Sequence, residues 1–98
     1  EGIDLACPLG TPVRTARDGI IVVAGNEGGY GNLVVVRHSN GYETCYGHLS
    51  KFLVKEGQRV KKGDVVALSG NTGRTTGRHL HYEIRKNGKA LNPKYFAK

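Results

Sequence analysis

The residues with the clearest chemical potential are two histidines near the end of the sequence. His79 and His81 stand two positions apart in the segment 79–85, which alternates between polar and apolar residues. Residues two apart in a β-strand lie on the same face of the sheet, so a strand here would place both imidazoles side by side. Neutral imidazole nitrogens bind Zn²⁺ at about 2.0–2.1 Å. The pair indicates a metal site, although two surface histidines would give the same pattern.

Further residues could complete such a site. Asp4 lies between apolar residues, where a carboxylate serves as a metal ligand, a helix cap or a turn former. His48 ends an expected strand, and His38 precedes an expected hairpin turn, where a hydrogen-bonded structural role is the simpler interpretation. A hydrolytic zinc site needs three protein ligands, an open position for water and groups that move protons. The sequence supplies these residue types, but their spacing alone does not assign the roles.

The elements that must position these residues are short strands separated by turns. Runs rich in β-branched residues or with alternating pattern predict strands over residues 19–24, 33–36, 42–49, 65–68 and 79–85. The Asn-Gly pairs at 40–41 and 87–88 predict hairpin turns. No segment has the 3.6-residue periodicity of a helix over eleven residues. We therefore expect an all-β fold, a single antiparallel β-sheet domain with long glycine-rich loops at 26–32 and 70–78.

Length and composition narrow the remaining possibilities. The 98 residues correspond to one domain, 1–98, and the 15 glycines agree with many turns. No apolar run approaches the roughly 18–20 residues of a membrane span, and no signal-peptide pattern opens the sequence. Because Glu1 reads as the interior of a segment, we expect a domain excised from a longer chain. Cys7 and Cys45 allow one disulfide, but we expect two unpaired thiols.

The net charge of +7 favours anionic partners, which include nucleic acids, anionic membrane surfaces and acidic cell-wall polymers. The sign of the charge does not choose among them. Proteins that bind single-stranded nucleic acids stack bases on surface aromatic residues. The five tyrosines and two phenylalanines are scattered and form no aromatic-basic motif, so we expect no nucleic-acid partner.

Along almost its whole length the chain resembles the lysostaphin-type, or LytM-like, zinc metalloendopeptidases, a family of cell-wall hydrolases. The most specific motifs are Gly2-Ile3-Asp4, Tyr46-Gly47-His48-Leu49 and Gly77-Arg78-His79-Leu80-His81. Further matching motifs are residues 8–13, 16–19, 29–32, 38–42, 57–63 and 70–73. The resemblance implies a barrel-sandwich β fold and the hydrolysis of peptide bonds in peptidoglycan stem peptides or cross-bridges.

The resemblance also implies roles for individual residues and Zn²⁺ as the cofactor. Asp4 and His81 match zinc ligands of the family. His79 matches the catalytic residue that activates the zinc-bound water, and His48 matches a second active-site histidine that stabilises the oxyanion or steers the proton. The family's first ligand histidine stands four residues before the aspartate, a position that falls immediately before Glu1.

The same resemblance implies a peptidoglycan peptide as substrate and the cell envelope, periplasmic or extracellular, as the place of action. A regulatory flanking domain and a wall amidase are the further partners that it suggests. The alternative function is that of a ligand-deficient LytM-like module, which binds peptidoglycan or activates an amidase without catalysis. The identity of the residue that precedes Glu1 distinguishes this module from the peptidase.

Overall fold

The computed structural model describes residues 3–6, 9–70, 79–87 and 89–91; of residues 3–6, 79–81, 90 and 91 it describes the backbone. Within these residues the chain forms nine β-strands and two short 3-10 helices. The strands are β1 (Ile3–Ala6), β2 (Pro12–Arg14), β3 (Gly19–Asn26), β4 (Asn32–Arg37), β5 (Tyr42–Phe52), β6 (Arg59–Val60), β7 (Val65–Ser69), β8 (His79–Lys86) and β9 (Lys89–Leu91). The 3-10 helices are η1 (Gly28–Tyr30) and η2 (Ser39–Gly41).

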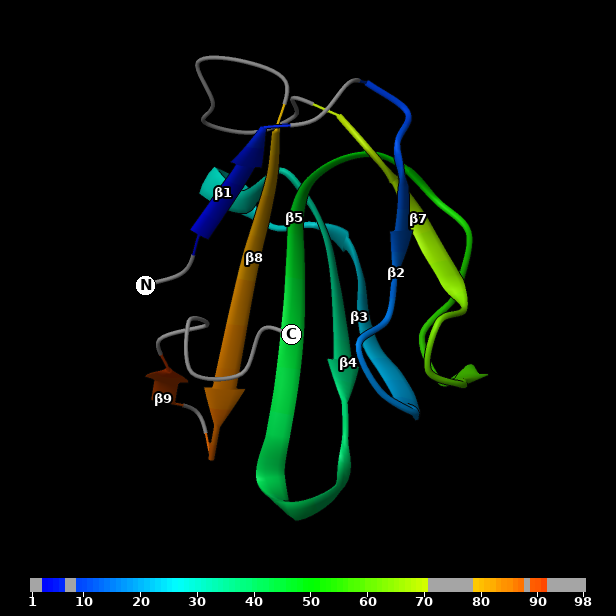
Figure 1. The fold of residues 1–98 in the computed structure, drawn as a ribbon, viewed down its shortest axis with the longest axis vertical. Helices are drawn as coiled ribbons and strands as arrows, with labels where there is room; N and C mark the ends of the chain where they lie inside the picture. Colours follow the sequence, from blue (N-terminus) through cyan, green and yellow to red (C-terminus); the bar gives the residue numbers. More distant parts are fainter. Residues whose placement is uncertain (1–2, 7–8, 71–78, 88, 92–98) are drawn as a thin grey trace.

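The strands pair in one antiparallel sheet that curls over on itself (Figure 1). The main path runs in the order β1-β8-β5-β4-β3-β6, and β9 extends it beside β8. β7 pairs with the end of β5 and also with β2, so these two strands fold back over one face of the main sheet. The fold-class prediction, an all-β antiparallel domain, is therefore confirmed.

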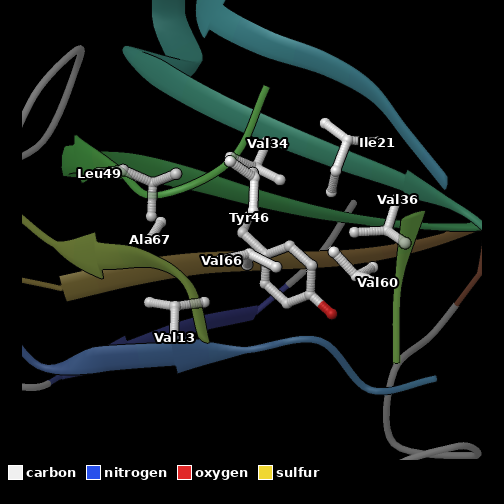
Figure 2. Packing of buried hydrophobic residues seen from close by; sticks show 10 residues of the cluster. Val13, Ile21, Val34, Val36, Tyr46, Leu49, Val60, Val66 and Ala67 are labelled. Carbon is white, nitrogen blue, oxygen red and sulfur yellow. The ribbon is translucent and has the colours of Figure 1, made fainter. Parts of the chain in front are cut away.

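The hydrophobic core lies between this folded-back pair and the main sheet. Val34 and Val36 from β4 and Leu49 from β5 are fully buried and face Val13 of β2 and Val66 of β7 (Figure 2). Fully burying an aliphatic side chain of this size stabilises a protein by roughly 1.5–3 kcal/mol. The β-branched runs that predict these strands therefore also form most of their packing.

Five strands agree with the sequence prediction, and four strands were not predicted. The predicted runs correspond to β3, β4, β5, β7 and β8, each of which is longer than expected by one to three residues. The Asn-Gly prediction at 40–41 is confirmed, because Asn40 and Gly41 have φ angles of 60° and 77° and join β4 to β5. The short strands β1, β2, β6 and β9 carry few β-branched residues, and their pairing partners determine their conformation. None of the described segments forms a helix with the length and hydropathy that crossing a membrane requires.

Gly19 begins β3 at a point where the chain leaves no room for a side chain. A Cβ atom built there would overlap the Arg37 carbonyl oxygen and would lie 2.7 Å from Cγ1 of Val36. Both neighbours belong to β4 in the middle of the sheet, so neither can move without disturbing the ladder. By contrast, a Cβ atom at Gly25 of the same strand would meet no atom within 4 Å.

We expect Gly19→Ala to lower the free energy of unfolding by about 1–3 kcal/mol, because the added methyl group overpacks the β3–β4 contact. Gly25→Ala is the matched control and should leave stability unchanged or raise it by up to about 1 kcal/mol. Urea denaturation followed by far-ultraviolet circular dichroism measures both. Equal effects of the two substitutions would contradict the steric interpretation.

Candidate metal and catalytic site

Backbone register brings the predicted site residues together on three neighbouring strands. Asp4 of β1 pairs with His81 of β8, and His81 pairs in turn with Gly47 of β5. His79 pairs with Ala6 two residue pairs further along the ladder. Residues paired across antiparallel strands have Cα atoms about 4.5–5.5 Å apart. The ladder therefore places the backbones of Asp4 and His81 next to each other, with His48 following Gly47 directly.

His48 lies in a β-bulge. Asn32 pairs with Leu49 and Val34 pairs with Tyr46, so β5 has one more residue than β4 between these two pairs. His48 has a φ angle of 58°, a left-handed conformation that costs a residue other than glycine roughly 1–2 kcal/mol. Its side chain is buried, with 6% exposure. Bulges next to active sites re-aim a side chain out of the regular alternation, and that is what this one does for His48.

A side-chain hydrogen bond holds the bulge in place. The Asn32 side-chain amide donates to the Leu49 carbonyl oxygen at 2.9 Å, directly after His48. Leu49 itself is fully buried in the core. The residue that follows the strained His48 is therefore fixed twice, by its core side chain and by a cross-strand hydrogen bond, so the bulge has little freedom to relax.

A buried ionic cluster lies on the same strand as the two predicted histidines, and the sequence analysis did not identify it. The side chain of Glu83 is buried, with 2% exposure. Its Oε2 accepts a hydrogen bond from Arg85 Nε at 2.7 Å, and its Oε1 accepts one from the Tyr30 hydroxyl at 3.0 Å. Arg85 Nη2 donates to the Tyr30 hydroxyl oxygen at 2.9 Å. Burial, together with the adjacent Glu83 carboxylate, raises the pKa of Tyr30. The alternation of 79, 81, 83 and 85 along one strand is the signal that could have found this cluster.

Cys45 lies beside Glu83 in the register of β5 and β8 and is completely buried. Its thiol is free, and burial raises its pKa to about 11. Cys7 lies outside the described residues, as does the terminal segment 92–98. The structure therefore bears out the buried, unpaired thiol expected of Cys45.

His38 takes no part in this arrangement. Its Nδ1 lies 2.7 Å from the Asp18 carbonyl oxygen, and its Nε2 lies 2.8 Å from Thr44 Oγ1, so a neutral ring satisfies both contacts. The structural role that the sequence predicts for His38 is confirmed. A cavity of about 490 Å³ is lined by His38 and also by Tyr82 and Ile84 of β8. Tyr82 and Ile84 alternate with residues 81 and 83 along β8, so this cavity lies on the face of the sheet opposite to Glu83.

Metal-binding capacity at this site depends on the side chains of Asp4 and His81. Among the side chains that the structure describes, no three histidine, cysteine, aspartate or glutamate residues gather into a metal site. The set of residue types does suit zinc, because imidazole nitrogen and carboxylate oxygen are both zinc ligands. Their positions on two directly paired strands make the backbone beneath such ligands rigid.

Comparison with known proteins decides the family. Residues 1–93 match peptidase family M23. The chain belongs to this family. Among M23 relatives it is 56% identical over 92 residues to the DD-carboxypeptidase/endopeptidase Mpg of Neisseria meningitidis serogroup B, a match that covers 94% of this chain and 21% of that protein. It is 54% identical over 92 residues to the peptidoglycan DD-endopeptidase ShyA of Vibrio cholerae, with the same coverage of each. The chain thus spans about a fifth of the length of these curated relatives.

Solved structures of peptidases share the fold. The catalytic domain of lysostaphin from Staphylococcus simulans superimposes with a TM-score of 0.91 at 38% identity, over 97% of this chain and 76% of that one. A zinc-containing peptidase from Vibrio cholerae gives a TM-score of 0.89 at 44% identity, over 92% of this chain and 28% of that one. The resemblance to lysostaphin-type peptidases seen in the sequence is thereby confirmed.

Because His48 has a left-handed backbone, we expect His48→Gly to be more stable than His48→Ala by about 1 kcal/mol. Both variants lose the imidazole, so their difference isolates the backbone. Lys51, an exposed residue later in β5, is the control, and there alanine should be more stable than glycine by about 0.5–1 kcal/mol. Urea midpoints measure all four variants. If alanine is more stable than glycine at both positions, the bulge stores no strain.

The raised pKa and the burial of Cys45 predict a protected thiol. At pH 8 a thiol with a pKa near 11 is about 0.1% thiolate, and only the thiolate attacks a disulfide reagent. In a Cys7→Ser variant we expect no reaction of Cys45 with Ellman's reagent until guanidinium is added, and then one thiol. Rapid reaction of the native variant would contradict the buried position. The wild-type chain, denatured without reductant, should show both thiols.

Proposed function

We propose that this chain is the catalytic domain, 1–98, of a zinc-dependent endopeptidase in the cell envelope that hydrolyses peptide bonds in peptidoglycan stem peptides or cross-bridges. The observation that carries the proposal is the Asp4–His81–Gly47 register, with His48 in a strained bulge beside it, in a chain of family M23. Relatives named as peptidoglycan DD-endopeptidases favour this function over a non-catalytic module. They also favour a peptidoglycan peptide as the substrate.

Asp4 and His81 would hold the metal. Their side chains offer an oxygen and a nitrogen donor, and a hydrolytic zinc site uses three protein ligands with one position left for water. The position four residues before Asp4, where the family's pattern has a histidine, would supply the third ligand. When bound, zinc supplies a Lewis acid that polarises the scissile carbonyl and lowers the pKa of the attacking water.

The other two histidines would handle protons and charge. His79, two residues from His81, would accept a proton from the attacking water on an imidazole nitrogen and deliver it to the leaving amine. His48 would donate a hydrogen bond to the oxygen that becomes negative as the carbonyl carbon turns tetrahedral. Fixing His48 in the bulge before substrate arrives means that little reorganisation is required during the reaction, which is the condition for electrostatic catalysis.

Two substitutions should separate ligand from base in the chain extended upstream by its native residues. We expect His81→Ala to lose zinc, because a ligand is removed. His79→Ala should keep one zinc per chain but lose turnover by about 10²–10⁴-fold, the usual contribution of a general base. Metal analysis gives the stoichiometry, and release of peptide fragments from purified peptidoglycan gives the turnover.

Lys51→Ala is the control for these variants, because Lys51 is exposed and belongs to the same sheet. It should retain both zinc and turnover. Loss of zinc from His79→Ala as complete as that from His81→Ala would show that the role assigned to His79 is wrong. Absence of zinc from the unmodified extended chain would reject the metallopeptidase and support the non-catalytic module.

A further inference from the structure

The side chain of Tyr30 joins the loop between β3 and β4 to β8, a strand two positions away from β4 in the sheet. Val35 of β4, Cys45 of β5 and Glu83 of β8 form one row in the backbone register. Tyr30 packs against the hydrophobic cluster of Leu33, Val35 and Cys45, and its hydroxyl reaches Glu83 at 3.0 Å. Neighbouring strands are about 4.8 Å apart, so the row from Val35 to Glu83 spans about 10 Å of the sheet. The short helix η1, which carries Tyr30, therefore lies over the sheet beside β8 (Figure 1, cyan).

The row beneath Tyr30 is adjacent to the row of the proposed zinc site. Cys45 and Gly47 are two residues apart on β5, and Glu83 and His81 are two residues apart on β8. Residues two apart in a strand share a face of the sheet. Because Gly47 pairs with His81 and His81 with Asp4, the covered row and the site row are consecutive on one face. The loop around η1 therefore borders the site.

Glu83 is not needed to keep β8 in the sheet. The pairing of β8 with β1, β5 and β9 is a backbone ladder that any residue type could form. A buried carboxylate is costly unless it is paired and hydrogen-bonded, and an apolar residue in its place would serve stability as well. What only a carboxylate provides here is an anionic acceptor that holds Arg85 and the Tyr30 hydroxyl together. The guanidinium also lies 5.8 Å from the centre of the Tyr30 ring.

The loop that Tyr30 anchors joins the ends of β3 and β4 and is restrained there by the Asn26–Asn32 pair. Gly28 and Gly31 have φ angles of 54° and 66°, and residues 26–29 are exposed. The backbone bonds within the loop run between Glu27, Gly28, Tyr30 and Gly31 and so close the turn on itself. The Asn26–Asn32 pair of β3 and β4 holds the two ends of the loop, but it lies on the far side of the sheet from β8. The contact of the loop with β8 runs through the Tyr30 ring and hydroxyl.

We propose that Glu83 is a positioning residue that, together with Arg85, holds Tyr30 and so fixes the loop 27–31 as a wall of the substrate-binding surface. The proposal rests on the proposed peptidase function. Glu83 and Arg85 do not touch substrate; they act through Tyr30 and the loop. A loop that moves binds the peptide less well but leaves the metal ligands and the base in place. Loosening the anchor therefore raises KM while kcat and zinc content stay near their original values.

The test uses Tyr30→Phe, which removes only the hydroxyl, and Glu83→Gln, which removes only the charge, in the extended zinc-loaded chain. With a soluble cross-linked muropeptide as substrate, we expect Tyr30→Phe to raise KM about tenfold, with kcat changed less than about twofold. Amide hydrogen exchange of residues 27–31 should accelerate by about tenfold as the loop opens more often. The double variant should raise KM no further than the stronger single variant, because both break the same contact.

Tyr46→Phe is the matched control. It also removes a tyrosine hydroxyl that takes part in a hydrogen bond, here accepting from the Ala16 amide at 3.1 Å on the other face of the sheet. It should lower the melting temperature but leave KM and the exchange of residues 27–31 unchanged. An effect of Tyr46→Phe on KM equal to that of Tyr30→Phe would reduce the role of Glu83 to general stability.

The outcomes for the two proposals are distinct. Unchanged exchange of residues 27–31 in Tyr30→Phe would overturn the inference, and so would a fall in kcat without a rise in KM. If the unmodified chain binds zinc but cleaves no peptidoglycan, the proposed function fails. Hydrogen exchange needs no activity, so it still decides in that case whether Glu83 and Tyr30 hold the loop.

Discussion

The pairing of β5 with β8 is the constraint on which the rest of the structure depends. Six residue pairs, from Tyr42–Lys86 to Gly47–His81, set this register. A slip of one residue would exchange the two faces of β8, exposing Ile84 and turning Glu83 into the hydrophobic core. The hairpin turns at the far end hold the register, because the Asn87 amide donates to the Gly41 carbonyl oxygen at 2.9 Å. The position of the site therefore depends on contacts made at the opposite end of the two strands.

The two faces of the main sheet have different roles. One face packs valines and leucines under β2 and β7 and stabilises the fold. The other face carries a buried carboxylate, a buried thiol and, in the adjacent bulge, a histidine with a left-handed backbone. The buried carboxylate and the left-handed backbone each cost stability or at best leave it unchanged, whereas the thiol belongs to a small hydrophobic cluster with Leu33 and Val35. Two unfavourable features that lie next to one row of the ladder indicate that this part of the face serves function rather than folding.

The sequence predicts the interior of this fold better than its edges. Val34–Val36 and the Asn40–Gly41 turn have strong local signals, and the structure has a strand and a hairpin there. The edge strands β1, β2, β6 and β9 are two to four residues long, and β1, β2 and β6 take their conformation from partners distant in the sequence. For the same reason, the H-x-H spacing predicts a shared face for His79 and His81 but not that Asp4 pairs with His81. That pairing joins opposite ends of the chain, and only the folded ladder determines it.

Glu83 is a functional candidate that the spacing of the two histidines does not by itself reveal. The same two-residue alternation that relates His79 to His81 continues to Glu83 and Arg85, and the sequence displays it plainly. What the sequence does not display is Tyr30, which reaches this row from a loop fifty-three residues earlier. The paired strands β1, β5 and β8 thus form the surface beneath the proposed site, whereas the glycine-rich loop 27–31 forms one side of it and is held by the Tyr30 side chain. Because the loop and the strands are separate elements, the loop can differ between related chains without moving the residues proposed to bind the metal.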